Sequence, residues 1–450
     1  MSNYEIKWDS VEKEAVEILR SYLQINTTNP PGNETAGAVF LKKILEDEGI
    51  LCEIFESQPG RGSLISGCSE DRGIPDVILL HHIDVVPAEE KKWNHPPFSA
   101  AYIDGEIWGR GAVDCKSLGV MELMAFILLK RQGISPERHV VYAATADEEA
   151  GGKWGVQWLL EHHPSKLSAG YIINEGMGLG INTENNNLYF CQVAEKGANW
   201  IRINFEGKPG HASLPHRDNC VVEMAKAIDA LSHHEFPIHI TGPVERFIYE
   251  MARVQEFMPE RDFLDMLDES QSRKVLKKIP LKILRRMIEA SLKHTLVPTV
   301  VSAGTKTNVI PSSCFCEVDC RILPGSTPDD LLKTITEILR ERGCRNFSIE
   351  FLGESLSSES PPDTPLYELL EKSIKKNDPK GKMVSFMSTG ATDSRFFRQK
   401  GIPAYGIQID SSLEAIETVH GHNERIRAEK LTMGIKILYD ILREVCSGNL

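Results

Sequence analysis

Short apolar runs alternate with helical segments in the N-terminal part of this chain, and this alternation restricts the fold more than any other feature. The runs at 76–86, 138–148 and 170–176 are almost continuously apolar, as strands buried on both faces are. Between the first two, the segment 117–133 is apolar enough for a buried helix. Strands that alternate with helices predict an α/β domain, in which helices flank both faces of a sheet.

Residues 194–354 follow a different pattern. The stretch 195–210 alternates apolar and polar side chains, as a half-exposed strand does. Helices are expected at about 219–233 and 329–343, and another strand at 347–354. This block has a strand and helix order of its own and predicts an inserted α+β domain.

The length of the chain supports that division, because 450 residues exceed one typical core. We expect the larger domain to consist of residues 1–193 and 355–450, with 194–354 inserted between them. Within the insert, residues 243–295 are helical and rich in charge, and we expect them to enlarge the inserted domain. Their basic helix could bind a membrane surface, but the acidic balance of the whole chain favours a solvated face.

Charge and hydropathy exclude several classes of protein. The formal net charge is −13 and the sequence pI is about 5.6, so we expect no nucleic-acid partner, which would need a basic footprint. No run of about 18 apolar residues occurs, so neither a membrane span nor a membrane partner is expected. The first residues are charged and lack the apolar stretch of a secretory signal, which predicts a cytoplasmic protein.

Ten cysteines are spread along the chain without the spacing of a disulfide scaffold. Cys314, Cys316 and Cys320 lie close together, but the paired Cys-x-x-Cys spacing of a zinc site is missing. Small apolar side chains on a strand explain this stretch better, so we expect these thiols to pack in a core.

Acidic residues and histidines recur where the predicted strands end. His82 and Asp84 lie two apart and share one face of a strand, where a carboxylate can hold the second ring nitrogen of a metal-bound histidine. Asp114 follows a glycine-rich turn ahead of the apolar helix, where it could also be a simple helix cap. Later strand ends and the C-terminal part supply Glu148, Glu149, Glu175, His420, His422 and Glu424.

Together these residues predict two metal sites. Two histidines and three carboxylates can serve two cations if one carboxylate bridges them, and such mixed ligands suit zinc, cobalt or manganese better than calcium. A metal pair about 3.5–4 Å apart can hold a shared water, and one further carboxylate must stay free to take its proton. The adjacent Glu148 and Glu149 offer both a ligand and a free base, although a solvated acidic turn would also explain the pair taken alone.

Eight motifs resemble those of the M20 family, which includes aminoacylases, succinyl-diaminopimelate desuccinylase, acetylornithine deacetylase, carnosinase-like dipeptidases and glutamate carboxypeptidases. In chain order they are LLHHIDVVP, GRGAVDCKSLG, DEEAGG, NEG, GKPGHAS, TNVIP, GATDSRFF and VHGHNE, and they span residues 79–424. The resemblance implies a zinc-peptidase-like catalytic domain with a mixed sheet flanked by helices. It also implies an inserted α+β lid and dimerisation domain, and hence a homodimer.

The resemblance assigns five metal ligands, which are His82, Asp114, Glu149, Glu175 and His420. Asp114 would bridge the two metals, and the peptide bond after it would be cis. Asp84 would orient His82, and Glu148 would be the general base. The family pattern His-x-x-Asn-Glu favours His420 over His422 as the ligand near the C-terminus.

For the inserted domain, the resemblance implies that His211 enters the active site of the partner subunit as a catalytic donor to the oxyanion. The strand NWIRINF, at 199–205, is expected at a sheet edge, where it could pair across a two-fold axis. Arg395 could bind a substrate carboxylate, or it could pair with Asp393 instead. The implied substrate-binding residues are Asn308, Arg321, Gly390, Thr392 and Arg395.

The expected activity is hydrolysis of the amide bond of an N-acyl amino acid or a related small carboxylate-bearing amide. Glu175 is a glutamate where aminopeptidase relatives carry aspartate, which favours acylase or carboxypeptidase activity. A dipeptidase or carboxypeptidase on the same scaffold is the alternative, and a dipeptidase would need a pocket for a free α-amino group. A non-catalytic binding module would be expected to have lost the base or a ligand, and all of them are present here.

Overall fold

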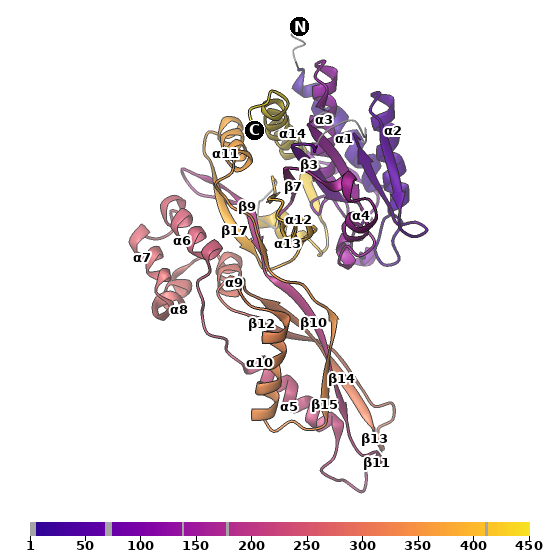
Figure 1. Cartoon of the computed structure of the whole chain (residues 1–450), viewed down its shortest axis with the longest axis vertical. Coiled ribbons are helices and arrows are strands. Elements are labelled where there is room, and N and C mark those ends of the chain that lie inside the picture. Colours follow the sequence, from indigo (N-terminus) through magenta and orange to yellow (C-terminus); the bar gives the residue numbers. More distant parts are fainter. Residues whose placement is uncertain (1–5, 68–73, 137–138, 177–179, 410–412) are drawn as a thin grey trace.

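The computed structural model describes residues 6–67, 74–136, 139–176, 180–409 and 413–450, and Figure 1 shows their arrangement. A large mixed sheet with helices on both faces occupies the upper part of the view. A four-stranded antiparallel sheet extends from it towards the bottom of the view. Within the described ranges, no helix combines the length and the apolar character needed to cross a membrane.

The large sheet contains the three strands predicted from continuous apolar runs, and they lie side by side as β6, β3 and β7. These strands and β18 run parallel to one another. The described strands follow the order β1-β2-β6-β3-β7-β18-β9-β16, with β17 and β8 also paired to β9. Their bounds are β1 (Cys52–Glu56), β2 (Gly62–Ser66), β3 (Val77–His82), β6 (Val140–Thr145), β7 (Tyr171–Glu175), β8 (Ile181–Asn182), β9 (Asn187–Glu195), β16 (Ser358–Glu359), β17 (Gly381–Ser388) and β18 (Ala404–Ile407).

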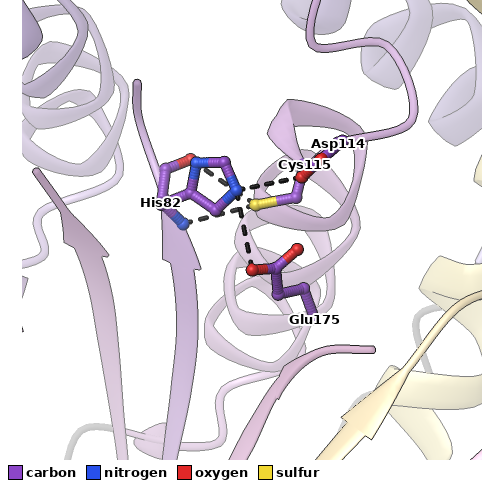
Figure 2. Close-up of side chains that lie close together, drawn as sticks. All are labelled: His82, Asp114, Cys115 and Glu175. Atoms are coloured by element: carbon purple, nitrogen blue, oxygen red, sulfur yellow. Dashed lines mark hydrogen bonds and ion pairs between the residues drawn. The ribbon is translucent and has the colours of Figure 1, made fainter. Parts of the chain in front are cut away.

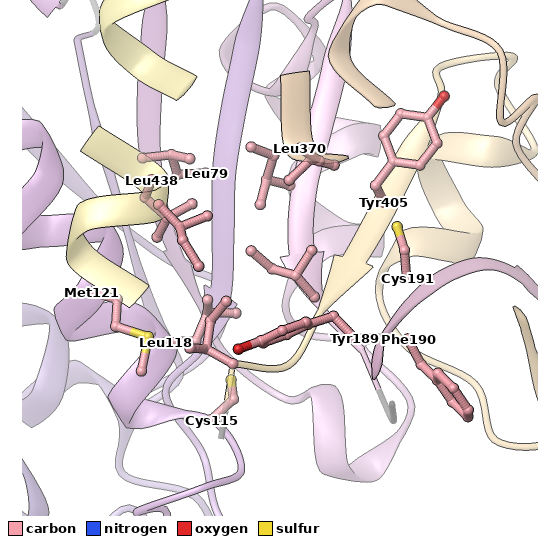
Figure 3. Packing of buried hydrophobic residues seen from close by; sticks show 14 of the residues in the cluster. Leu79, Cys115, Leu118, Met121, Tyr189, Phe190, Cys191, Leu370, Tyr405 and Leu438 are labelled. Atoms are coloured by element: carbon pink, nitrogen blue, oxygen red, sulfur yellow. The ribbon is translucent and has the colours of Figure 1, made fainter. Parts of the chain in front are cut away.

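Alternate residues of β3 enter two different cores, which is why this strand is apolar throughout. Leu79 packs in the core of one face, together with Met121 and Leu438 from two long helices (Figure 3). Leu80 packs on the opposite face with Leu159. The first face is covered by α1 (Trp8–Leu23), α2 (Glu34–Asp47), α3 (Lys116–Arg131), α11 (Pro365–Asn377) and α14 (Ala428–Cys446), and the second by α4 (Val156–His162) and α12 (Ser394–Arg398).

The four-stranded sheet has the order β12-β14-β10-β15, and α5 (Cys220–His233) and α10 (Pro328–Glu341) bury one of its faces. Its strands are β10 (Gly197–Glu206), β12 (Thr295–Ala303), β14 (Ser313–Ile322) and β15 (Phe347–Gly353). Buried and half-buried residues alternate along β14, so that the thiols of Cys314, Cys316 and Cys320 pack in this core. These cysteines are core residues, as the sequence predicted.

The expectation that 199–205 forms a sheet edge is wrong. These residues belong to β10, which is paired with β14 on one side and with β15 on the other. The alternating pattern determines which face of β10 is buried, but it carries no information about neighbours within the sheet. The edges are β12 and β15 instead.

The helical segment within 243–295 packs against the large sheet, whereas the sequence led us to expect that it enlarges the inserted domain. Its helices are α6 (Gly242–Val254), α7 (Glu260–Leu264), α8 (Glu269–Lys278) and α9 (Lys282–Ser291). Phe247 of α6 makes an edge-to-face contact with Phe190 of β9, with ring centroids 5.8 Å apart. The apolar faces of α6 and α9 belong to the core of the large sheet. Amphipathic helices bury their apolar face against another apolar surface, and the large sheet offers one.

Smaller elements complete the described chain. The ribbon of β11 (Gly210–His211) and β13 (Val309–Ile310) lies at the far tip of the four-stranded sheet (Figure 1). The remaining elements are β4 (Ala101–Ile103), β5 (Glu106–Trp108), β19 (Arg425–Arg427), α13 (Leu413–Thr418) and the 3₁₀ turns η1 (Glu90–Lys92), η3 (Glu148–Ala150), η4 (Pro164–Leu167) and η5 (Asp265–Leu267).

Candidate metal centre

The predicted ligands meet at the edge where the central parallel strands end. His82 is the last residue of β3, and Glu175 is the last residue of β7. Glu148 and Glu149 follow β6 in the turn η3. Parallel strands bring their carboxyl ends to one edge, where α/β sheets bind their ligands.

Two carboxylates surround the outer nitrogen of His82 (Figure 2). Its Nε2 lies 3.0 Å from Oδ1 of Asp114 and 3.7 Å from Oε1 of Glu175. The ligand atoms of these three residues and the thiol of Cys115 all lie within 4.8 Å of one another. Cys115 was not among the predicted site residues, and its thiol accepts a hydrogen bond from the backbone N–H of His82 at 3.3 Å.

A second group shares Asp114 with the first. Nε2 of His420 lies 3.0 Å from Oδ2 of Asp114 and 3.2 Å from Oε2 of Glu149. The two oxygens of Asp114 therefore face different histidines, as a bridging carboxylate would require. The Asp114–Cys115 peptide bond is cis, as the resemblance implied. His422 lies outside the group, with its Nε2 4.0 Å from Glu89.

The cluster concentrates negative charge in a buried place. Burial raises the pKa values of Glu148 and Glu149 and raises that of Glu175 to about 7, and neighbouring carboxylates add to each shift. Burial alone would also raise the pKa of Asp114, but hydrogen bonds from His420 and His82 hold it well below its usual range. Among the described atoms, Oε1 of Glu149 is buried without a hydrogen-bond partner. A donor set of imidazoles and carboxylates with these properties fits divalent cations.

Asp84 has more contacts than the sequence predicted. Nδ1 of His82 lies 2.9 Å from the backbone oxygen of Asp84 and 3.5 Å from its Oδ1. The carboxylate itself accepts the backbone N–H groups of Glu148 and Glu149, both at 3.1 Å, and the side-chain amide of Asn29 at 2.8 Å. Asp84 therefore holds His82 and also the turn that carries the predicted base.

Sequence reasoning missed a buried network that supports the same turn. Asp147, directly before Glu148, has a φ of 70°, in the left-handed region that few side-chain-bearing residues adopt. Its carboxylate pairs with Arg61 and accepts the amide of Asn29 at 3.2 Å. Asp147 is adjacent to the predicted pair in sequence, but nothing local to Asn29 or Arg61 indicates that they meet it.

A cavity of about 1120 Å³ opens over the cluster and is lined by most of its residues. One wall carries Gly390, Thr392 and Arg395, which the resemblance proposed for substrate binding. The other wall comes from the four-stranded sheet and includes Trp200 and Arg321. The cavity therefore lies between the two sheets, as expected for a site closed by an inserted domain.

The arginines in this cavity already have partners. Arg321 makes a two-point ion pair with Asp319, at 2.7 and 2.9 Å. Arg395 donates to the backbone oxygens of Thr392 and Gly151, both at 2.7 Å. The described hydrogen bonds of Arg395 go to backbone oxygens and not to Asp393.

His211 and Asn308 lie away from the cluster within the same chain. Both are exposed in the ribbon at the far tip of the four-stranded sheet, where the backbone oxygen of Asn308 accepts the N–H of Ala212 at 3.0 Å. Nδ1 of His211 lies 2.7 Å from the hydroxyl of Ser213. Neither residue lines the cavity over the metal ligands.

The sequence and fold resemble those of known hydrolases. The chain is 25% identical to N-fatty-acyl-amino acid synthase/hydrolase PM20D1 of Xenopus tropicalis, over 97% of this chain and 87% of that protein. It is 24% identical to aminoacylase-1 of Mus musculus, over 97% of this chain and 96% of that protein.

Among solved structures, the metallo-carboxypeptidase Sso-CP2 from Sulfolobus solfataricus matches with a TM-score of 0.74 and 20% identity, over 96% of this chain and 99% of that chain. Human carnosine dipeptidase 1 matches with a TM-score of 0.71 and 14% identity, over 98% of this chain and 97% of that chain. These likenesses confirm the predicted fold class, a catalytic α/β domain with an inserted lid domain.

The model of peptidase family M20/M25/M40 matches residues 78–444, which include every predicted metal ligand. The resemblance drawn from the sequence motifs is thereby confirmed. The chain belongs to peptidase family M20/M25/M40 and is a metal-dependent hydrolase of that family.

Proposed function

We propose that this protein is a two-metal amidohydrolase that cleaves the amide bond of N-acyl amino acids or related small amides that bear a carboxylate. The observation that carries the proposal is the position of Asp114. Its two oxygens face two separate candidate ligand groups, and Glu148 lies beside them on the wall of a large cavity. A bridged metal pair with an adjacent free carboxylate is the arrangement that metal-assisted hydrolysis needs.

In this proposal His82 and Glu175 hold one cation, Glu149 and His420 hold the other, and Asp114 is shared. Two observations support this assignment of ligands. Oε1 of Glu149 is buried without a described hydrogen-bond partner, and a bound cation would provide one. The pKa values of Glu149 and Glu175 are raised, and a bound cation would lower them. Zinc suits these ligands best, and cobalt or manganese could replace it.

Bound cations would polarise the scissile carbonyl and lower the pKa of the attacking water. Glu148 takes the proton from that water and delivers it to the leaving nitrogen. Burial and the charge of Glu175 raise the pKa of Glu148 well above its usual value, which makes its carboxylate a stronger base towards the water. Asp84 fixes the direction of Glu148 by holding its backbone N–H.

The cavity offers separate surfaces for the two ends of such a substrate. We place the carboxylate of the substrate near Arg395, Gly390 and Thr392, with Arg321 on the facing wall. Trp200 and Leu352, which are 42% and 45% exposed, present apolar surface to the same cavity and could contact the acyl group. The similarity to an N-fatty-acyl-amino acid synthase/hydrolase and to an aminoacylase supports this substrate class.

We also propose a homodimer in which Asn308 and His211 of one subunit complete the site of the other. Both lie in an exposed ribbon far from the metal ligands of their own chain. The edge strand β12 exposes Val297 and Val301, at 53% and 57%, and an exposed apolar edge is a template for pairing with a second copy.

The division of the chain belongs to the same proposal. The catalytic domain comprises 1–193 and 355–450, and the lid comprises 194–354. The chain leaves the large sheet at the end of β9 and its next strand in that sheet is β16, which supports the outer bounds, while the helices α6 to α9 between them pack on the large sheet. Free buried thiols such as Cys316 suit a reducing, cytoplasmic compartment.

A hydrolysis screen tests the proposed activity. Protein loaded with zinc, cobalt or manganese is assayed against N-acetyl and N-lauroyl amino acids, against the matching amides without a carboxylate, and against dipeptides. We expect the N-acyl amino acids to be cleaved fastest and Glu148→Gln to abolish the activity. Faster cleavage of dipeptides would instead make the protein a dipeptidase on the same scaffold, and cleavage in the absence of metal would overturn the proposal.

A further inference from the structure

Glu424 lies four residues after His420 and has no part in the roles assigned so far. Its side chain is fully buried, and its carboxylate accepts hydrogen bonds along the turn that carries Asp114. Oε1 accepts the backbone N–H groups of Val113 at 2.7 Å and Asp114 at 3.0 Å. Oε2 accepts the backbone N–H of Gly111 at 3.0 Å. Three N–H groups of one turn are thus fixed by a single carboxylate.

Arg110 completes the arrangement from the other side. Its side chain is 2% exposed, and its guanidinium pairs with Oε2 of Glu424 at 2.8 Å. The other end of the guanidinium donates to the backbone oxygen of Gly421 at 2.7 Å, directly beside His420. The backbone N–H of Gly109 donates to the backbone oxygen of Glu424 at 2.9 Å. Arg110 and Glu424 therefore tie the Asp114 turn to the His420 turn.

The His420 turn needs such support, because its backbone is unusual. His420 and Asn423 have φ values of 55° and 63°, in the left-handed region that costs free energy for residues with a side chain. Such conformations persist only where surrounding contacts fix them. The Arg110–Gly421 bond and the buried carboxylate of Glu424 provide contacts on both sides of this turn.

We propose that Arg110 and Glu424 form a clip that sets the spacing between Asp114 and His420, and so the affinity of the metal that His420 and Glu149 hold. In the described contacts the clip bonds backbone groups and not the ligand atoms, so both are positioning residues. The inference rests on the metal assignment proposed above. His82 and Glu175 end strands β3 and β7, whose positions are fixed by the sheet and not by the clip. Asp114 serves both sites, but only the site of His420 has a second ligand that depends on the clip, so the two metal sites should respond unequally when the clip is broken.

The test measures metal affinity in the full-length protein. Metal-free wild type and Glu424→Gln are titrated with zinc against a chromophoric chelator, and thermal unfolding of the metal-free proteins is recorded alongside. The glutamine amide presents an NH₂ group where the carboxylate accepted backbone N–H groups, so it cannot hold the turn. We expect the zinc constant of the His420 site to fall about 10–100-fold, the usual effect of removing a group that orients metal ligands, and the other constant to fall much less.

Glu195→Gln is the matched control. Glu195 is equally buried and pairs with Arg398 at 2.7 Å, but its other described hydrogen bonds come from Thr392 and Gln192 and from no turn that carries a metal ligand. We expect Glu195→Gln to lower the unfolding temperature while keeping both zinc constants. A general loss of stability would weaken metal binding in both variants alike, which would contradict the clip.

A His420→Ala background identifies the site that is affected. There the second metal is already lost, so Glu424→Gln should lower the remaining zinc constant much less than it lowers the constant of the His420 site in the wild-type background. If Glu424→Gln does not fold, Arg110→Lys keeps the charge but loses the second donor to Gly421, and a smaller loss at the same site is expected. Two unchanged zinc constants in folded variants, or equal losses at both sites, would overturn the clip alone. A wild type that binds no metal pair would overturn both the clip and the proposed function.

Discussion

The carboxylate of Asp84 accepts the backbone N–H of Glu148 at 3.1 Å. Its second oxygen accepts the N–H of Glu149 at the same distance, and His82 turns its Nδ1 towards the backbone oxygen of Asp84 at 2.9 Å. One buried aspartate thus fixes a predicted ligand of each metal and the predicted base between them. Substitution of Asp84 should therefore disturb the turn of Glu148 and Glu149 as well as the orientation of His82.

We predict that Asp84→Asn lowers kcat about 10–100-fold, because one carboxylate oxygen becomes an NH₂ group that cannot accept the N–H of the turn. Steady-state kinetics and metal analysis measure the effect. Asp76→Asn is the control, since Asp76 precedes the same strand at its opposite end and its described ion pair is with the half-exposed His139. Equal losses in the two variants would show that the effect comes from the strand and not from the site.

Glu148→Gln should keep both metals and lower turnover by about 10²–10⁴, the usual contribution of a general base. In our assignment Glu148 is the acidic residue of the cluster that stays free of metal. Metal content by elemental analysis, measured beside kcat, separates the two roles. Loss of a metal equivalent together with activity would make Glu148 a ligand instead.

Asp114→Ala should empty both metal sites, because its two oxygens face His82 and His420 at 3.0 Å each. Glu175→Ala, which removes a group that faces only the first of these histidines in the described contacts, should release about one metal at most. Equilibrium dialysis followed by metal analysis tests both variants. One full metal equivalent retained at normal affinity in Asp114→Ala would count against the bridge.

The metal affinity of the His420 site should rise with pH. Hydrogen bonds to Asp114 and Glu149 raise the pKa of His420 to about 10 in the metal-free protein, so a metal must displace a proton at neutral pH. The raised pKa means that the proton is held at low pH and lost as pH approaches about 10. The apparent affinity should therefore increase about tenfold per pH unit below that value.

Competition with a chelator, corrected for the chelator's own titration, measures this slope. His422→Asn should leave it unchanged, because His422 lies beside Glu89 and outside the ligand group. An affinity that does not depend on pH would mean that the metal does not displace a proton from His420.

Mixing two inactive proteins tests the delivery of His211 by a partner subunit. His211→Ala should lose about 10²–10³ in turnover, as removal of one oxyanion donor does. If His211 acts across the dimer, a mixed dimer with Glu148→Gln has one site with both lesions and one site with none, so activity returns. Subunit exchange without any return of activity would contradict this delivery, and so would a fully active monomer.

Much of the fold was predictable because it depends on local pattern. Strands β3, β6 and β7 appear where continuous apolar runs predicted them, since a strand buried on both faces must be apolar throughout. The alternating residues of β14 also bury their cysteines as predicted. The site assignments remain predictions, but the structure brings the residues named for the two metals into two groups that share Asp114.

The sequence by itself determined that His82 and Glu175 end buried strands, and it predicted which residues would carry the chemistry, because motifs and hydrophobic periodicity are local properties of the chain. Only the tertiary structure decided which elements are neighbours: β10 is central in its sheet, and α6 covers the large sheet. It also decided that Glu424 reaches the turn of Asp114, 310 residues away, and that Arg61 reaches Asp147, 86 residues away. Such pairings depend on which apolar faces can be buried together and on which buried charges must find a partner, and no local pattern records either.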